Sequence, residues 1–99
     1  MNPLQLMKQA QQLQERMQQE MSSLTVEGAS GGGMVTVVAN GHKHLQKLTI
    51  DPEAVSKEDV EMLQDLIVAA VNDALRKVDD ELKTKVGGIM GGLGLPGLP

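Results

Sequence analysis

The chain carries a dense glycine cluster, since four of the six residues from Gly28 to Gly33 are glycine. Such a cluster is typical either of a phosphate-binding loop or of a turn between strands. A phosphate loop contains Gly-Lys-Ser or Gly-Lys-Thr and leads into a helix, and the dinucleotide fingerprint also opens a helix. Here the glycines lead into MVTVVAN, a β-type segment with no lysine before it. The cluster therefore predicts a hairpin and not a nucleotide site.

Three short β-type segments follow one another through the middle of the chain, over residues 24–29, 33–40 and 44–51. Asn40-Gly41 separates the second from the third and is a strong hairpin signal. Because short turns join antiparallel neighbours, these segments predict a three-stranded antiparallel sheet. The second segment is apolar on both faces, with Met34 and Val38 on one and Val35, Val37 and Ala39 on the other. This pattern is typical of a strand that is covered on both sides or that meets a second subunit.

Helix-periodic segments flank the β-type segments. The first is predicted over residues 3–24, with Asn2 and Pro3 suited to its start, and its apolar seam is Leu6, Ala10, Leu13, Met17 and Leu24. The second is predicted over residues 56–86, from a capping-box-like Ser56 and Asp59, and its stripe is Val60, Leu63, Ile67, Ala70, Val71, Ala74, Val78 and Leu82. The element order predicts an α+β fold, alpha-beta-beta-beta-alpha.

Residues 1–86 are thus predicted to form a single domain, and residues 87–99 a flexible tail of Gly, Leu and Pro. A docking peptide that orders on binding is the alternative for the tail. A chain of 99 residues buries only a modest share of its surface, so we expect it to form an oligomer.

Composition removes several classes of function. The chain has no Phe, Tyr or Trp, which excludes base stacking on aromatic side chains, and no Cys, which excludes disulfides and thiolate metal sites. The N-terminus lacks the apolar run of a signal peptide, and no segment reaches the length of a membrane span. We therefore expect a cytoplasmic protein that has no contact with the membrane.

Catalytic chemistry is not predicted. His42 and His44 share one side of an extended segment, but zinc needs three or four ligands and no third His is present. No nucleophile, base and orienting group can be assigned together. We expect no enzyme, no metal, no cofactor and no small-molecule substrate.

The first helix carries a polar face beside its apolar seam. Its members fall within an arc of about 80°: Gln5, Lys8, Gln12, Arg16 and Gln19. Lys and Arg neutralise phosphates, and Gln can hydrogen-bond phosphate oxygens or adenine edges. A solvated helix face is the alternative. The net charge of −4 is unusual for a nucleic-acid binder, but the acids gather in residues 57–73, while residues 76–85 hold four cations against three acids.

The sequence resembles the YbaB/EbfC family of bacterial nucleoid-associated proteins. The resemblance is carried by VEGASGGGMVTVVANG (residues 26–41), LTIDPEAV (48–55) and LQDLIVAAVNDA (63–74), in the family's order, and it covers nearly the whole chain. It implies a homodimer with paired sheets at its centre and helices that project as arms. It also implies a cytoplasmic protein of the nucleoid that binds double-stranded DNA and influences nucleoid organisation and gene expression.

The family's DNA contacts are ascribed to polar and charged positions on the helical arms. In this chain they correspond to Lys8, Gln12 and Arg16 on the first helix and Arg76, Lys77, Lys83 and Lys85 on the second. The alternative function is a dimeric adaptor that holds a protein partner with its Met-rich helix faces and its apolar tail.

Overall fold

The structure of the chain, a computed structural model, describes residues 2–92. Helix α1 (Pro3–Ser23) is followed by strands β1 (Thr25–Ser30), β2 (Val35–Asn40) and β3 (Leu45–Ile50), a short 3-10 helix η1 (Pro52–Ala54) and helix α2 (Val60–Gly92). The strands form one antiparallel sheet in the order β1-β2-β3. This arrangement confirms the predicted alpha-beta-beta-beta-alpha fold, and the strand bounds differ from those predicted by one or two residues.

The glycine cluster forms the hairpin turn between β1 and β2. Gly31, Gly32 and Gly33 all have positive φ, at 62°, 70° and 97°. Side chains rarely adopt this left-handed region, so glycine suits each position. The second turn places its positive φ at Lys43 and not at Gly41.

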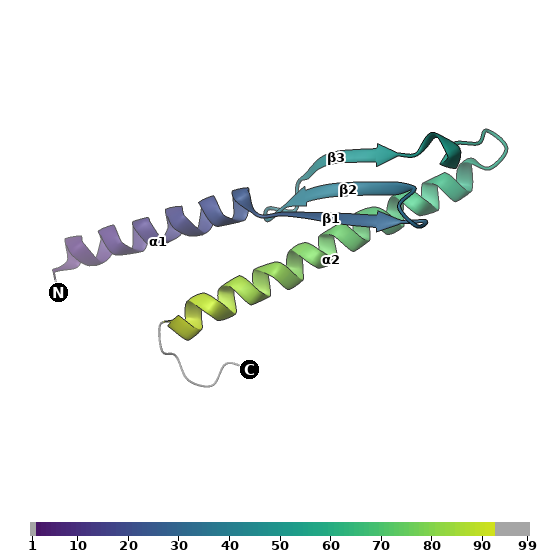
Figure 1. The fold of residues 1–99 in the computed structure, drawn as a ribbon. Coiled ribbons are helices and arrows are strands. Elements are labelled where there is room, and N and C mark those ends of the chain that lie inside the picture. Colours follow the sequence, from purple (N-terminus) through teal and green to yellow (C-terminus); the bar gives the residue numbers. More distant parts are fainter. Residues whose placement is uncertain (1, 93–99) are drawn as a thin grey trace.

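One face of the sheet is covered by α2, which crosses it diagonally over β1 and β2 (Figure 1). The buried core consists of Val35, Val37 and Ala39 from β2 and Ala70, Ala74 and Val78 from α2. The predicted helix stripe is therefore confirmed at its centre, whereas Val60 at its start is 52% exposed. Gly28 of β1 lies directly beneath α2, and a Cβ built there would stand 2.5 Å from the carbonyl oxygen of Ala70.

Both ends of α2 differ from the prediction. The helix begins at Val60 and not at residue 56, because Asp59 is the capping residue and its Oδ1 accepts the N–H of Met62 at 3.1 Å. It continues through Gly87 and Gly88 and ends at Gly92, whereas the sequence predicts an end at residue 86. Glycine costs about 1 kcal/mol relative to alanine in a helix, but adding residues to an established helix avoids the cost of nucleation. Of the predicted tail, residues 87–92 are thus helical and 93–99 lie outside the described residues.

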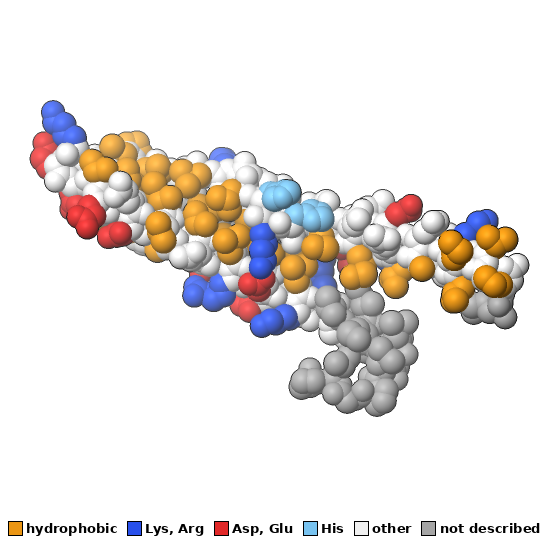
Figure 2. Space-filling view, turned by 180° about the vertical axis from the view of Figure 1, so that it is seen from behind, with side chains coloured by type: hydrophobic (Ala, Val, Ile, Leu, Met, Phe, Trp, Pro, Cys, Tyr) orange, Lys and Arg blue, Asp and Glu red, His pale blue; other side chains and the backbone are white. Residues whose placement is uncertain are grey.

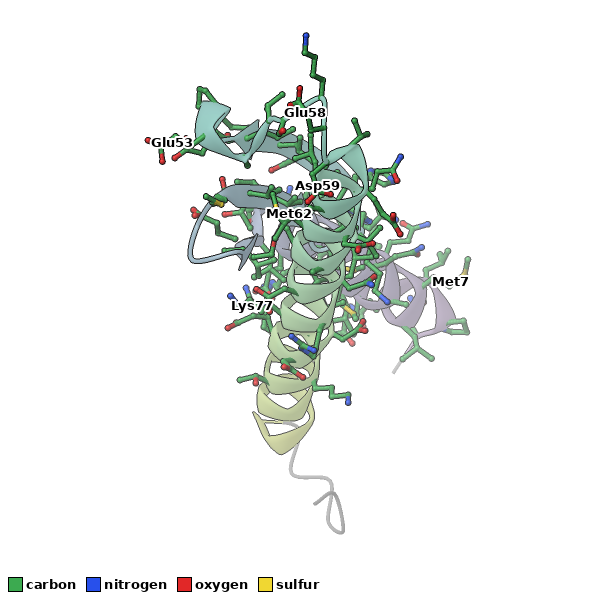
Figure 3. All side chains as sticks on the ribbon, turned by 90° about the vertical axis from the view of Figure 1, so that its right-hand side faces the viewer. Met7, Glu53, Glu58, Asp59, Met62 and Lys77 are labelled. Carbon is green, nitrogen blue, oxygen red and sulfur yellow. The ribbon has the colours of Figure 1, made fainter. Side chains whose placement is uncertain are left out.

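Helix α1 projects from one end of the sheet and buries none of its residues (Figure 1). The C-terminal half of α2 extends beyond the same end. Viewed along the molecule in Figure 3, the two helices leave the sheet in different directions. The chain therefore carries two helical arms on a small sheet.

Candidate nucleic-acid interface

The polar face of α1 holds two cations with no ionic partner among the described residues. Lys8, Gln12 and Arg16 follow one another at intervals of four along the helix, and all three are exposed. This spacing keeps them on one side of the helix over about 12 Å. No ion pair forms to Lys8 or Arg16 within residues 2–92, so both charges are available to an external anion.

The base of the α1 arm is fixed to the turn between β2 and β3. The N–H of Gly41 donates to the carbonyl of Met21 at 2.8 Å, and the Nε2 of His42 is hydrogen-bonded to the hydroxyl of Ser22 at 3.0 Å. A Cβ built at Gly41 would stand 2.8 Å from the Cα of Met21. The glycine therefore permits the close approach that sets the direction of the arm, a role that the turn signal in the sequence did not reveal.

The cations of α2 divide into two groups. Arg76 and Lys77 both pair with Asp73, at 2.9 and 3.2 Å, and the Lys77 ammonium also donates to the carbonyl of Glu27 in β1 at 3.0 Å. Lys83 and Lys85 form no ion pair within the described part of the chain. A separation of two residues places these two on opposite sides of the helix. Lys83 is exposed, and Lys85 is half-buried.

Asp73 organises the contact between α2 and the edge of the sheet. Its carboxylate accepts the backbone N–H of Ala29 at 3.0 Å, and this bond, together with Lys77 and Arg76, lowers its pKa from 3.8 to about 2. Lys77 is therefore held in the fold by its contacts with Asp73 and β1. Lys8 and Arg16 form no such contact among the described residues. Sequence reasoning missed the role of Asp73, because nothing in the spacing Asp73, Arg76, Lys77 identifies the strand that lies opposite.

We expect an Asp73→Asn variant to show a weaker dependence of stability on acid than the wild-type protein. A carboxyl whose pKa is lowered by folding stabilises the protein above its unfolded pKa, and this contribution disappears as the pH falls through the folded pKa. The difference in free energy of unfolding between the two proteins should therefore shrink between about pH 4 and about pH 2. Thermal unfolding at matched chain concentrations measures it, and parallel curves across this window would contradict the assignment.

The histidine pair shows no sign of a metal centre. The rings of His42 and His44 lie 6.0 Å apart, and their backbone N–H groups both donate to the side chain of Asn40. Within residues 2–92 no group of three potential ligands forms. The pair belongs to the turn that supports α1.

Acidic side chains gather at the opposite end of the molecule from α1. Figure 3 places Glu53, Glu58 and Asp59 around η1 and the start of α2, and Figure 2 shows the same concentration of carboxylates. A polyanion would be repelled from this end. The charge distribution therefore favours the helical arms as the side from which an anionic ligand approaches.

The fold and this surface define a small α+β protein that carries, on one face of a projecting helix, two cations with no ionic partner among the described residues. Over residues 1–93 the sequence matches the YbaB/EbfC DNA-binding family, and the chain belongs to that family. The resemblance seen in the sequence is thereby confirmed. The match is to a DNA-binding family and not to a family of enzymes.

Bacterial relatives carry the name nucleoid-associated protein. One from Acetivibrio thermocellus is 56% identical over 97 residues, which cover 94% of this chain and 86% of the relative. One from Syntrophobacter fumaroxidans is 50% identical, with 98% and 88% covered. The crystal structure of an uncharacterized Helicobacter pylori protein has a similar fold, with a TM-score of 0.66 and 27% identity over 85% of this chain and 98% of that one. Within the described residues, neither helix is long and apolar enough to cross a bilayer.

Proposed function

We propose that this protein binds double-stranded DNA as a homodimer, chiefly through phosphate contacts from its helical arms. The observation that carries the proposal is the row of Lys8, Gln12 and Arg16, which is exposed on a projecting helix and has no acidic partner within residues 2–92. Such cations release counterions from the duplex when they bind, and this release supplies affinity independent of base sequence. Gln12 can add hydrogen bonds to backbone oxygens.

Two properties of the single chain support a dimer. Its solvent-accessible surface is 7256 Å², about a third more than the roughly 5,500 Å² expected of a compact monomer of its mass. Its radius of gyration is 19.0 Å, against about 13 Å for a compact domain of this length. The surplus area exceeds the roughly 800 Å² that each partner buries in a standard interface.

The exposed seam of α1 supports the same conclusion. Leu4, Leu6 and Leu13 are 70%, 58% and 43% exposed, and the helix packs on nothing over most of its length. Most helical stability in proteins comes from packing an apolar face. A second copy would provide that packing and would double the number of free cations.

In the cell we propose that the dimer acts at the nucleoid in the cytoplasm, where it influences nucleoid organisation and gene expression. The names of its relatives support this place of action. The alternative is a protein adaptor that uses Met-rich helix faces and the apolar tail. Within the described residues it is favoured by exposed methionines such as Met7, which is 60% exposed. Burial of α1 in a dimer accounts for these methionines equally well.

The salt dependence of binding tests the proposed function. Two copies present Lys8 and Arg16 twice, so we expect at least four phosphate contacts and a slope of log affinity against log salt of about −3.6 or steeper. Titration of a labelled duplex with the protein, followed by fluorescence anisotropy between about 50 and 200 mM salt, measures the slope.

Two results would contradict the proposal. Absence of binding to any duplex at about 50 mM salt would exclude the activity. Binding with a slope near zero would exclude phosphate contacts as its source. An unrelated acidic protein of similar size is the control for nonspecific effects of salt on the signal.

A further inference from the structure

The loop between β2 and β3, residues 41–43, lies at the end of the sheet from which both helical arms project (Figure 1). We call this loop the arm junction. Gly41 and His42 bond to the last turn of α1. Lys43 bonds to α2, where its ammonium lies 2.7 Å from a carboxylate oxygen of Asp79. The residues of one short loop therefore connect the two arms to each other as well as to the sheet.

The glycine of the arm junction does not stand where the hairpin needs one. The N–H of Asn40 donates to the carbonyl of His44 at 3.0 Å, and the N–H of Lys43 donates to the carbonyl of Asn40 at 2.9 Å, so the hairpin has a three-residue loop. The third residue of such a loop adopts the left-handed region, which favours glycine, but here it is Lys43, with a φ of 63°. Gly41 takes the first position instead, against the backbone of Met21. The chemistry of the turn alone therefore accounts for neither residue.

The ion pair between Lys43 and Asp79 stabilises the fold too weakly to explain the lysine. Both side chains are 48% exposed, and an exposed pair contributes little because water and salt screen it. A left-handed backbone, by contrast, is unfavourable for residues that carry a Cβ. Backbone strain that no strong contact offsets indicates a role in function. For Lys43 that role is the connection to α2.

The direction of α1 depends on contacts at its base. Residues 4–19 of the helix are exposed, and the half-buried residues begin only at Glu20. Lys8 lies about 20 Å from Met21 along the helix axis. A rotation of about 15° at the base would move Lys8 by about 5 Å, whereas an ammonium pairs with an oxygen only within about 4 Å. Small movements at the arm junction therefore decide which phosphates the arm can reach.

We propose that the arm junction holds α1 and α2 at a fixed angle, with Lys43 as the positioning residue, so that both arms reach the phosphates of one duplex together. This inference rests on the DNA binding proposed above. The ion pair to Asp79 prevents α1 and the loop from rocking against α2. Lys43 acts through the arms and leaves the phosphate contacts to other residues, because its own ammonium is bonded to Asp79.

Removal of the Asp79 carboxylate tests the inference, because charge and position predict opposite results. Asp79→Asn makes the chain less acidic and releases Lys43, which by charge alone would strengthen binding to a polyanion. Loss of the ion pair instead lets the arms move, so we expect the affinity for a duplex at about 50 mM salt to fall at least about threefold. The matched control is Asp80→Asn, since Asp80 is exposed and forms no ion pair within residues 2–92. The control should bind at least as tightly as the wild type.

Two variants at the arm junction separate positioning from stability. Lys43→Gly removes the ion pair and relieves the left-handed backbone, so its Tm should be no lower than that of the wild type while its affinity for DNA falls. The charge swap Lys43→Asp with Asp79→Lys restores an ion pair at unchanged net charge and should recover most of the affinity. Weak binding by Lys43→Gly together with tighter binding by Asp79→Asn would show that Lys43 contacts DNA itself and would overturn the inference.

The angle between the arms is measured by the distance between two spin labels. The chain has no cysteine, so Gln11→Cys and Thr84→Cys, both at exposed positions, place one label on each arm. Labelled chains mixed with an excess of unlabelled chains report distances within a single chain. We expect a narrow distribution of distances with the wild-type junction and with Asp80→Asn, and a broader or shifted one with Asp79→Asn. Equal distributions in these two variants would overturn the inference.

Failure of the inference can be told apart from failure of the proposed function. If the wild-type protein binds no duplex, the proposed DNA binding is wrong, and the label distances alone then decide whether the arm junction fixes the arms. If the wild-type protein binds DNA but Asp79→Asn and Asp80→Asn bind it equally, the arm junction does not position the arms and the DNA binding stands.

Discussion

Reversal of both free charges on α1, Lys8→Glu with Arg16→Glu, is expected to weaken binding to duplex DNA by at least about 100-fold at low salt. The proposed dimer would lose four phosphate contacts and gain four carboxylates that repel the DNA backbone. The slope of log affinity against log salt should become shallower by about 3.6 units, since each lost contact removes about 0.9. In the part of the chain that the structure describes, neither side chain forms an ion pair or packs on the core, so the variant should remain folded and keep its oligomeric state.

The matched control is Lys57→Glu, compared with Arg16→Glu alone. Both single changes alter net charge equally, but Lys57 precedes the start of α2 at the acidic end of the molecule, far from α1. If binding depends only on net charge, the two variants will weaken it equally. If α1 contacts the duplex, Arg16→Glu will weaken it by several-fold more. Unchanged binding in the double variant would remove α1 from the site.

The cations of α2 show which features of the candidate site the sequence could predict and which it could not. Arg76 and Lys77 were assigned to DNA with Lys83 and Lys85 because a sequence reports charge but not what lies opposite it. The structure places Asp73 and the edge of β1 beside Arg76 and Lys77. Only Lys8 and Arg16 combine exposure, a shared helix face and the absence of a partner among the described residues, while Lys83 and Lys85 face opposite sides.

The fold could be predicted from the sequence more fully than the site, because the helices and strands depend on the periodicity of apolar residues. Apolar spacings of three and four fixed the two helices, and the glycines before a β-type segment predicted the first hairpin. The first and last residues of α2 were harder to predict from the sequence. Asp59 and Ser56 are equally good capping residues by type, and only the hydrogen bond to Met62 distinguishes them. Likewise, the glycines at 87 and 88 weaken a helix without determining where it ends.

The helix–sheet contact at Gly28 gives the largest expected effect on stability. In Gly28→Ala the new Cβ would stand 2.5 Å from the carbonyl oxygen of Ala70 and 2.7 Å from the Cβ of Ala74. The backbone nitrogen of Ala74 is also in the way. This nitrogen and the carbonyl oxygen of Ala70 belong to the helix backbone, which cannot rotate away as a flexible side chain can. Helix α2 must lift from the sheet, and we expect a loss of at least about 3 kcal/mol, the upper end for an overpacked core.

The contact also determines whether Asp73 and Lys77 reach β1, so lifting the helix should expose the edge that they cover. Loss of protection at the amide of Ala29 in hydrogen exchange would report this separately from global unfolding. The control is Gly87→Ala, since Gly87 is helical with open space around it, and alanine there should stabilise by up to about 1 kcal/mol. If Gly28→Ala lowers the free energy of unfolding and Gly87→Ala raises it, packing and not glycine content governs the stability. A Gly28→Ala variant as stable as the wild type would mean that α2 does not rest on β1 as described.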